Sequence, residues 1–323
     1  MNKCFAIALA AFAAGTVAHS PALAQNYPDH AIRIIVPYPA GGPADTVARV
    51  TTQGLGGQLG GNVVIENVAG AAGRIATKEV AHATPDGYTL LLGSSNEYAI
   101  TPALYKNLDY DPVKELTPVA ALVTDSVAIV VNPSVPVNSL AELVRYAKDH
   151  PGKLTSGSTL GIVTHLALMY FRVHMGADIL FVPYKGAAPA IADAMGNQIQ
   201  VTCSAKSVLL PLIKAGKLRA LAVSSAERWA ELPGVATFRE SGLEGFPPDV
   251  VFGLFAPAGT PSDIIAKLDE AEDARLNSPE VQAAVAKLGM RPHPLRPQDF
   301  AKAMDDQVQL WDAVVTEAGV HLD

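Results

Sequence analysis

The chain has 323 residues, with 24 Lys and Arg against 31 Asp and Glu and a formal net charge of −7. This length allows two domains with large cores. The acidic balance, without any basic run, argues against binding to nucleic acid or to an anionic membrane surface.

Residues 1–24 have the pattern of a secretory signal peptide. Lys3 supplies a positive charge, residues 4–17 are almost wholly apolar, and Ala22-Leu23-Ala24 is a small-x-small cleavage site. No later segment reaches about 18 consecutive apolar residues, the length of a membrane span. We therefore expect a soluble mature protein that starts at Gln25 and works in the periplasm.

The predicted cleavage changes the charge and the cysteine count. It removes Lys3 and no acidic residue, so the mature chain has 23 basic and 31 acidic residues and a net charge of −8. It also removes Cys4, which leaves Cys203 alone and excludes an intrachain disulfide. A single thiol in an oxidising compartment favours a buried, inert cysteine over a reactive one.

The first unit of the mature chain is residues 32–50. Residues 32–36 form an apolar, β-branched strand, residues 37–43 a turn rich in Pro and Gly, and Asp45 is the predicted N-cap of the helix that follows. Gly41 and Gly42 have no Cβ, so a ligand can approach backbone N–H groups at the positive end of the helix dipole. Such a corner suits a carboxylate or a phosphate, although an ordinary strand–helix turn has the same pattern.

Two similar units follow. Residues 62–67 form a strand that leads through Gly70 to Gly73 into a helix over 75–83, and residues 88–92 form a strand that ends in Gly93-Ser94-Ser95-Asn96. Three such units in a row predict a mostly parallel sheet covered by helices. Ligands in such sheets lie at the carboxyl ends of the strands, where all three turns fall.

The middle third predicts a second sheet of the same kind. A long β-rich run covers 122–131, and strands are predicted at 179–182, 199–203 and 218–223, with helices at 140–148, 163–173, 189–195 and 208–215. The last third adds a strand at 250–256 and helices at 261–276, 279–288 and 297–318.

Small hydroxyl residues precede the helix at 163–173. Ser156, Ser158, Thr159 and Thr164 can donate hydrogen bonds to a carboxylate without adding charge. Neutral donors bind an anion and still allow its release, which suits a delivery protein. Simple capping of that helix is the alternative interpretation.

Many landmarks, in one order along nearly all of the mature chain, resemble those of the substrate-binding proteins of tripartite tricarboxylate transporters, the Bug family. They are Val36-Pro37-Tyr38-Pro39 with Gly41-Gly42 and Asp45, Val64-Ile65-Glu66-Asn67 with Gly70 and Gly73, residues 85–90, Pro102-Ala103-Leu104-Tyr105 with Tyr110-Asp111-Pro112, residues 151–154, His165-Leu166, residues 182–186, residues 216–223 and residues 253–257.

The resemblance implies an α/β, two-lobed periplasmic-binding-protein fold of a type II-like kind, in which each lobe is a mostly parallel sheet flanked by helices. Residues 25–124 and 251–323 would form lobe 1, residues 125–250 lobe 2, and two β-strand crossovers would join them. It also implies a monomer that binds a small organic acid between the lobes and delivers it to transporter subunits in the membrane. A periplasmic sensor that passes its ligand state to a signalling receptor is the alternative.

The resemblance further implies a carboxylate held by backbone N–H groups and waters on loops that face each other. We combine the loops that the resemblance implies with the candidates that follow from residue chemistry alone. The expected ligand-binding residues are then Tyr38, Pro39, Ala40, Gly41, Gly42, Ala44, Asp45, Ser94, Ser156, Ser158, Thr159, Leu160, Thr164, His165, Tyr184, Gly186, Ala187, Ala188 and Lys206. For Asp45 an N-cap role, and for His165 a place in the core, are the alternatives. Arg74, Glu97 and Lys185 have no assigned role.

The chain departs from the family pattern at several of these positions. Pro43 and Ala44 replace a glycine and a hydroxyl residue, and Leu160 stands where a polar residue is usual. Lys206 could pair with a second carboxylate of the ligand. Fewer polar donors suit an aromatic or aliphatic acid better than a citrate-like one.

No enzyme motif accompanies these features. The sequence has no G-x-x-x-x-G-K-[ST], no G-x-G-x-x-G after a strand, no G-x-S-x-G and no H-E-x-x-H, and its eight histidines lack the spacing of metal ligands. We therefore expect a binding protein without catalysis, cofactor or metal.

Overall fold

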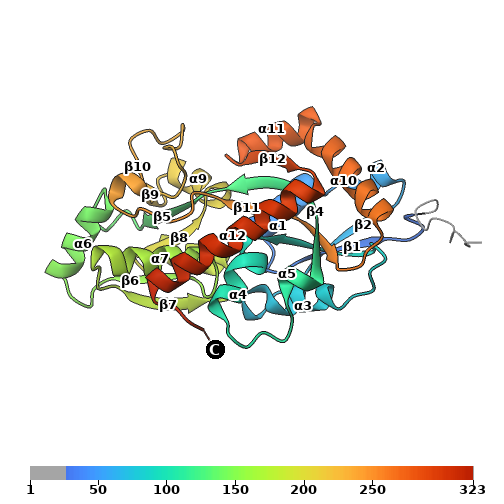
Figure 1. The fold of residues 1–323 in the computed structure, drawn as a ribbon. Helices are drawn as coiled ribbons and strands as arrows, with labels where there is room; N and C mark the ends of the chain where they lie inside the picture. Colours follow the sequence, from blue (N-terminus) through green and yellow to red (C-terminus); the bar gives the residue numbers. More distant parts are fainter. Residues whose placement is uncertain (1–26, 323) are drawn as a thin grey trace, which may run out of the picture.

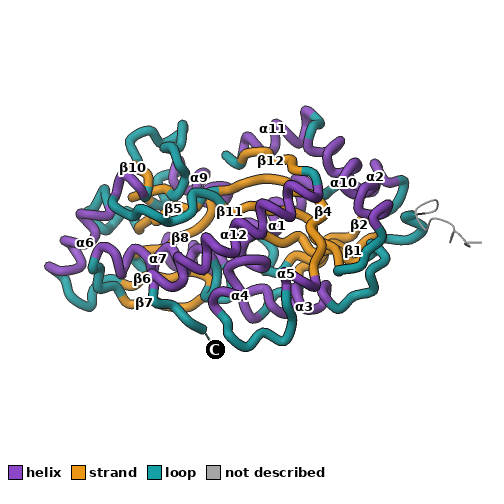
Figure 2. Tube along the Cα trace, in the orientation of Figure 1, coloured by secondary structure: helices purple, strands orange, loops and turns teal. Residues whose placement is uncertain are grey.

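The computed structural model describes residues 27–322, so the predicted signal peptide lies outside the described residues. Two mixed sheets of six strands each, both flanked by helices, lie side by side along the molecule (Figures 1 and 2). The two-lobed α/β fold that the sequence predicts is confirmed. The prediction that each sheet is mostly parallel is wrong for the first sheet, because β11 returns from the second half and pairs antiparallel with both β3 and β4.

The first sheet has the strand order β12-β4-β11-β3-β1-β2. Strands β1, β2 and β3 are parallel, whereas β11 runs antiparallel to both β3 and β4, and β12 antiparallel to β4. The elements of this half are β1 (Ile32–Val36), α1 (Pro43–Thr51), α2 (Leu55–Leu59), β2 (Val63–Asn67), α3 (Arg74–Ala81), β3 (Thr89–Ser94), η3 (Asn96–Ile100), α4 (Thr101–Leu104), α5 (Pro112–Glu115), β4 (Leu116–Asp125), β11 (Val250–Pro257), α10 (Ser262–Leu276), α11 (Pro279–Lys287) and β12 (Arg291–Leu295).

The second sheet has the order β10-β9-β5-β8-β6-β7. Strand β5 runs antiparallel to its two neighbours, and the other recorded pairs are parallel. The elements are β5 (Val127–Val131), α6 (Leu140–Asp149), β6 (Thr155–Thr159), α7 (Val163–Met175), β7 (Leu180–Tyr184), α8 (Ala187–Met195), β8 (Val201–Ala205), α9 (Lys206–Lys214), β9 (Arg219–Val223) and β10 (Ala236–Thr237).

Local sequence explains the central elements. All five residues of β5 are buried, as expected for a strand between two covered faces. In α6, Leu140, Leu143, Val144 and Ala147 form one buried face at helical spacing. Ser139 accepts a hydrogen bond from the Glu142 N–H and so caps α6, as its sequence predicts.

Two strand connections join the sheets. The run predicted as one strand at 122–131 is in fact two, because the chain leaves the first sheet at Asp125 and enters the second at Val127. Ser126 forms the joint, where its hydroxyl accepts a hydrogen bond of 2.9 Å from the Trp229 indole. Strand β11, which pairs with β4, carries the chain back to the first sheet.

Helix α12 (Pro297–Ala318) is a third link, and it crosses the molecule diagonally in Figure 1. The Phe300 ring, near its start, lies 5.1 Å from that of Phe255 in the first sheet. The Trp311 ring, about three turns further along α12, lies 5.5 Å from that of Phe246 in the loop before β11. Near the end of α12, Glu317 accepts a hydrogen bond of 2.9 Å from Tyr170 on α7. The proposed lobe boundaries place all of α12 in lobe 1, so its last turns reach across to lobe 2.

Cys203 is buried, as the sequence predicts, and burial raises the pKa of its thiol. Among residues 27–322, no helix combines the length and the apolar content that crossing a bilayer needs.

Glu272 on α10 makes stability depend on pH. Its side chain is fully buried, and neither carboxylate oxygen has a hydrogen-bond partner among the described residues. Burial raises its pKa to about 8, against the opposing effect of Arg275. The folded protein therefore keeps a proton that the unfolded chain releases at lower pH, and stability should fall as pH rises from about 4.5 to about 8.

We expect Glu272→Gln to remove this loss because the amide stays neutral. Between pH 5 and pH 9 the wild type should lose up to about 5 kcal/mol more stability than the variant, since the pKa rises from 4.5 to about 8 and one pKa unit is worth about 1.4 kcal/mol. Urea unfolding at pH 5 and pH 9 measures the difference. Glu270→Gln, an exposed position on the same helix, is the control. Equal responses of both variants to pH would contradict the prediction.

Candidate functional site

A small cavity lies between the two sheets and receives residues from both. The volume in which the centre of a water molecule fits is about 50 Å³. On the same measure, this is roughly three to five times the volume that a single water molecule needs. It is lined by Tyr38, Pro39, Ala40, Gly42, Pro43, Ala44, Asn96, Asp125, Val127, Thr159, Ile162, Val163, Thr164, Gly186, Ala187, Ala188, Ser204, Ala205, Val250 and Phe252.

Three helices begin at this cavity. The N-cap residues are Gly42 for α1, Ile162 for α7 and Gly186 for α8, and none of them makes a side-chain capping hydrogen bond. By contrast, Ser139 and Ser278 cap α6 and α11 elsewhere. First-turn N–H groups have no acceptor inside the helix, and the helix dipole is positive there. Pro43 has no N–H, and the Val163 N–H donates to Asn96. The remaining first-turn N–H groups of the three helices, such as those of Ala44, Thr164 and Ala187, are the neutral donors that an anionic group could use.

The turn before α1 differs from its prediction. Asp45 is not the N-cap, because the helix begins at Pro43 and Gly42 occupies that place. The Asp45 carboxylate instead accepts a hydrogen bond of 2.9 Å from the Gly41 N–H and pairs with Arg49. Asp45 thus holds the turn in shape, and Gly42 rather than Gly41 lines the cavity.

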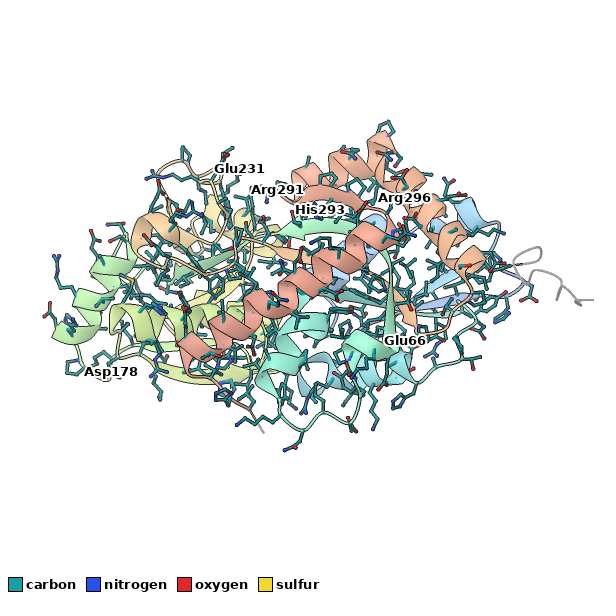
Figure 3. All side chains as sticks on the ribbon, in the orientation of Figure 1. Glu66, Asp178, Glu231, Arg291, His293 and Arg296 are labelled. Atoms are coloured by element: carbon teal, nitrogen blue, oxygen red, sulfur yellow. The ribbon has the colours of Figure 1, made fainter. Side chains whose placement is uncertain are left out.

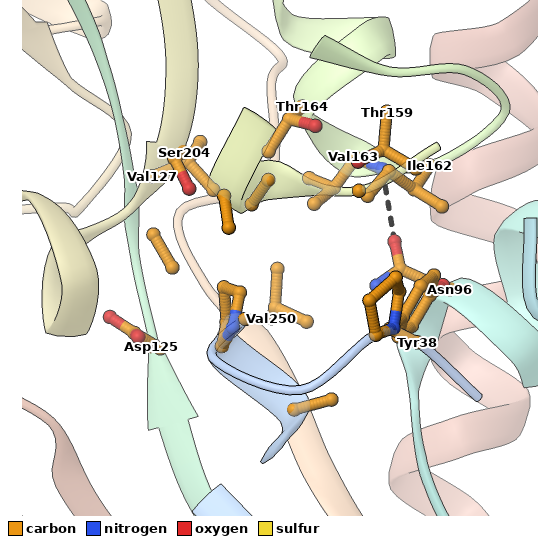
Figure 4. Close-up of a pocket in the computed structure, with 18 of the residues that line it drawn as sticks. Tyr38, Asn96, Asp125, Val127, Thr159, Ile162, Val163, Thr164, Ser204 and Val250 are labelled. Carbon is orange, nitrogen blue, oxygen red and sulfur yellow. Dashed lines mark hydrogen bonds between the residues drawn. The ribbon is translucent and has the colours of Figure 1, made fainter. Parts of the chain in front are cut away.

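A buried chain of hydrogen bonds connects the two halves beside the cavity. The Val163 N–H at the start of α7 donates to Asn96 Oδ1 at 2.9 Å, as the dashed line in Figure 4 shows. Asn96 Nδ2 donates to Ser94 Oγ at 2.9 Å, and that hydroxyl donates to Glu97 Oε2 at 2.8 Å. The Tyr38 hydroxyl donates to the other Glu97 oxygen at 2.5 Å. Burial raises the pKa of Glu97. Ser94 therefore lies behind the cavity wall and positions Asn96.

The predicted loop with hydroxyl residues at 156–161 is partly a strand. Residues 155–159 form β6, which pairs with β7 and β8, and this fixes the direction of each side chain. The Ser156 hydroxyl donates to the Leu180 carbonyl at 3.3 Å, and Ser158 is buried away from the cavity lining. Thr159 and Thr164 do line it.

His165 and Lys206, two further candidates, do not line the cavity. His165 is buried, its Nδ1 accepts a hydrogen bond of 3.4 Å from the Gly161 N–H, and burial lowers its pKa to about 4. The Lys206 ammonium lies 2.9 Å from a carboxylate oxygen of Glu231, which Figure 3 labels. Both side chains thus have partners within the protein.

A wider cleft adjoins the cavity and shares Tyr38, Pro39 and Thr159 with it. The candidates Leu160 and Tyr184 line this outer cleft, and two basic residues, Arg74 and Lys185, face it from opposite halves of the molecule. The Arg74 guanidinium lies 4.1 Å from the centre of the Tyr105 ring. Basic groups at an opening attract anions toward it.

The cavity itself has a different charge pattern. Its lining contains no Lys, Arg or His, and Asp125 is its one ionisable carboxyl group. Within residues 27–322, no group of three or more His, Cys, Asp and Glu is placed to hold a metal ion. An acid in this cavity would be bound by main-chain amides and hydroxyl groups.

Sequence reasoning missed half of the lining. The missed residues are Pro43, Asn96, Asp125, Val127, Ile162, Val163, Ser204, Ala205, Val250 and Phe252. Asn96 and Ser204 had a usable signal, since each stands at the carboxyl end of a strand that the sequence predicts, at 88–92 and 199–203, where ligands are expected. The ligand contacts of all the candidates stay predictions.

Comparisons with known proteins agree on one family. The family model described as "Tripartite tricarboxylate transporter family receptor" matches residues 47–320. Protein BugT of Bordetella pertussis is 35% identical over 305 residues, which cover 94% of each chain. The structure of MatC from Rhodopseudomonas palustris with bound malate is 33% identical, with a TM-score of 0.85 and coverage of 90% of this chain and 100% of that one. Another R. palustris structure, with adipate, is 33% identical, with a TM-score of 0.86 and coverage of 91% and 99%.

Proposed function

The chain belongs to the tripartite tricarboxylate transporter receptor family, the Bug proteins, and on this premise we propose that it captures a small carboxylic acid between its lobes. The ligand is a dicarboxylate, an aromatic acid or a related organic acid. The protein delivers it, chemically unchanged, to the membrane subunits of a tripartite tricarboxylate-type transporter. It works in the periplasm as a monomer, and it needs no cofactor.

One observation carries this proposal: the N-termini of three helices, whose own N-cap residues make no side-chain capping bond, meet at one cavity. Such N–H groups are the usual way to hold a carboxylate without a cationic side chain. The solved relatives named above contain malate and adipate, which supports a small acid as ligand. The lack of cationic side chains in the lining of the cavity favours such acids over citrate.

Both halves contribute to the site, so we infer that binding closes the lobes. A ligand shifts a two-state equilibrium only as far as it prefers one state, and an acid that touches α1 and α7 together prefers the closed one. The strand joint at Ser126 and the paired strand β11 are the candidate hinges. The closed and open forms then present different surfaces to the transporter.

A periplasmic sensor is the second candidate, because the same closure could signal to a receptor. Neighbouring genes for two membrane subunits would favour transport, and an adjacent sensor kinase would favour signalling.

A screen of small organic acids against the mature protein tests the proposal. The expected result is a higher melting temperature with at least one acid, since ligand at about 100 times its Kd adds about 2.7 kcal/mol of stability. Small-angle scattering should then show a smaller radius of gyration with the same acid. Calorimetry with citrate is the comparison. Tight citrate binding, without binding of monocyclic aromatic acids or straight-chain dicarboxylates, would contradict the expected ligand class.

A further inference from the structure

Asn96 makes a hydrogen bond between the two halves of the molecule. It follows β3 in the first half, and its Oδ1 atom accepts a hydrogen bond of 2.9 Å from the Val163 N–H at the start of α7 in the second half (Figure 4). The donor is a first-turn N–H without an acceptor inside its own helix, at the positive end of the helix dipole. The bond joins two protein groups, so its formation requires contact between the halves and no ligand.

The Asn96 side chain is buried and is held in place from its own half. Its Nδ2 group donates to Ser94 Oγ at 2.9 Å, and its backbone N–H donates to the same oxygen at 3.2 Å. The Ser94 hydroxyl in turn donates to Glu97 Oε2 at 2.8 Å, so its one hydrogen and both of its lone pairs are used. The Asn96 amide therefore has one orientation, with Oδ1 toward α7, and contact with α7 has little further side-chain entropy to remove.

The turn that carries Asn96 is also bonded to a strand that joins the lobes. The hydroxyl of Ser95 accepts a hydrogen bond of 3.2 Å from the Val251 N–H of β11. Residues 96–100 then form a π-helix, a rare conformation that is frequent at functional sites. Asn96 is thus fixed relative to a candidate hinge, and a rotation of the second half about that hinge makes or breaks its bond to α7.

We propose that Asn96 is a latch between the lobes, which stabilises the closed form through its bond to α7 and not through contact with the bound acid. This inference rests on the proposed function and adds a regulation of the same site. Opening exchanges the bond for bonds to water, so the latch is worth about fivefold in the ratio of closed to open protein, the net effect of one hydrogen bond. The apparent Kd is the intrinsic Kd divided by the closed fraction, so the latch also tightens binding.

Two other roles are compatible with the position of Asn96. It lines the cavity, so it could contact the acid directly, and its bonds to Ser94 could serve the local turn alone. Neither role affects how far the lobes close when no acid is present. The radius of gyration of the ligand-free protein therefore distinguishes the latch from both.

Small-angle scattering on the ligand-free mature protein and on Asn96→Ala tests the latch. The variant should have the larger radius of gyration, and saturation with malate or adipate should bring both proteins to the same smaller value. Calorimetry with these two acids should give an apparent Kd up to about fivefold higher for the variant. If Asn96→Ala does not fold, Asn96→Ser replaces it, because the serine hydroxyl is too short to reach α7.

Asn132→Ala is the matched control. Asn132 is also buried, but its amide group bonds within the second half, to the Ala194 carbonyl at 2.8 Å and from the Ser134 N–H at 2.9 Å. The control should lose stability and keep the radius of gyration and the affinity of the wild type.

An unchanged ligand-free radius of gyration in Asn96→Ala would overturn the inference. A loss of affinity alone would then mean that Asn96 contacts the acid, and no loss would mean a local role; the proposed function stands in both cases. Equal expansion of Asn96→Ala and Asn132→Ala would also overturn it, because the loss of any buried amide would then loosen the protein. If no acid of the wider screen binds, the proposed function falls, and the ligand-free comparison still decides on the latch.

Discussion

Replacing Ala188 by aspartate should weaken binding of the captured acid by about 100-fold or more. Ala188 is in the first turn of α8 and lines the cavity. A carboxylate there would bond to the same N–H groups that we assign to the ligand, and it would repel the ligand's own charge. A 100-fold loss corresponds to about 2.7 kcal/mol. Calorimetry with the best acid from the screen measures it.

The control for this variant is Ala192→Asp, which adds the same group at an equally exposed position of α8, one turn further from the helix N-terminus and away from the cavity lining. Its affinity should stay within about twofold of the wild type, because exposed charges are screened by solvent and salt. Equal losses in both variants would mean that net charge, rather than the α8 N-terminus, determines binding.

Replacing Gly161 by alanine should prevent full closure and weaken binding by about 10- to 100-fold. A Cβ at this position would lie 2.7 Å from the Tyr105 hydroxyl and 3.3 Å from both Ala72 Cβ and a Leu322 methyl group. These three neighbours belong to the half with the first sheet, whereas Gly161 precedes α7 in the other half. The added methyl group therefore lies where the halves meet, and scattering with saturating acid should show a larger radius of gyration than for the wild type.

Gly152→Ala separates this effect from backbone strain. Gly152 has φ +71°, close to the φ +79° of Gly161, but a Cβ there would meet no atom within 4 Å. Both variants should lose roughly 1 kcal/mol of stability, because alanine does not favour positive φ. Only Gly161→Ala should also lose affinity and compactness. If both variants bind like the wild type, the contact at Gly161 does not limit closure.

Some features of the site follow from local sequence. The glycines at 41 and 42, the strand before them and the helix after them predict an anion-binding corner, and Gly42 does line the cavity as the N-cap of α1. The same reasoning predicts the caps and the apolar faces of the helices, since Ser139 and the buried face of α6 lie within one segment. The spacing of apolar and capping residues within one segment is enough to predict these features, because the helix and strand periods repeat every few residues.

Other features depend on segments far apart in the sequence. Asn96 reaches the Val163 N–H, 67 positions further along the chain, only because the halves are in contact. The sequence predicts Asp45 as a helix N-cap, yet its carboxylate accepts a hydrogen bond from the Gly41 N–H in the preceding turn. Nothing local marks Asp125 as part of the cavity, since it stands within the run 122–131 that the sequence predicts as one β-rich strand.

The sequence by itself therefore determined the strand and helix units, the family and the glycine corner of this protein. Only the tertiary structure decided which side chains face the cavity and that three helix N-termini meet there. The physical reason is that secondary structure depends on neighbours in the chain, whereas a site between two lobes depends on how distant segments pack together.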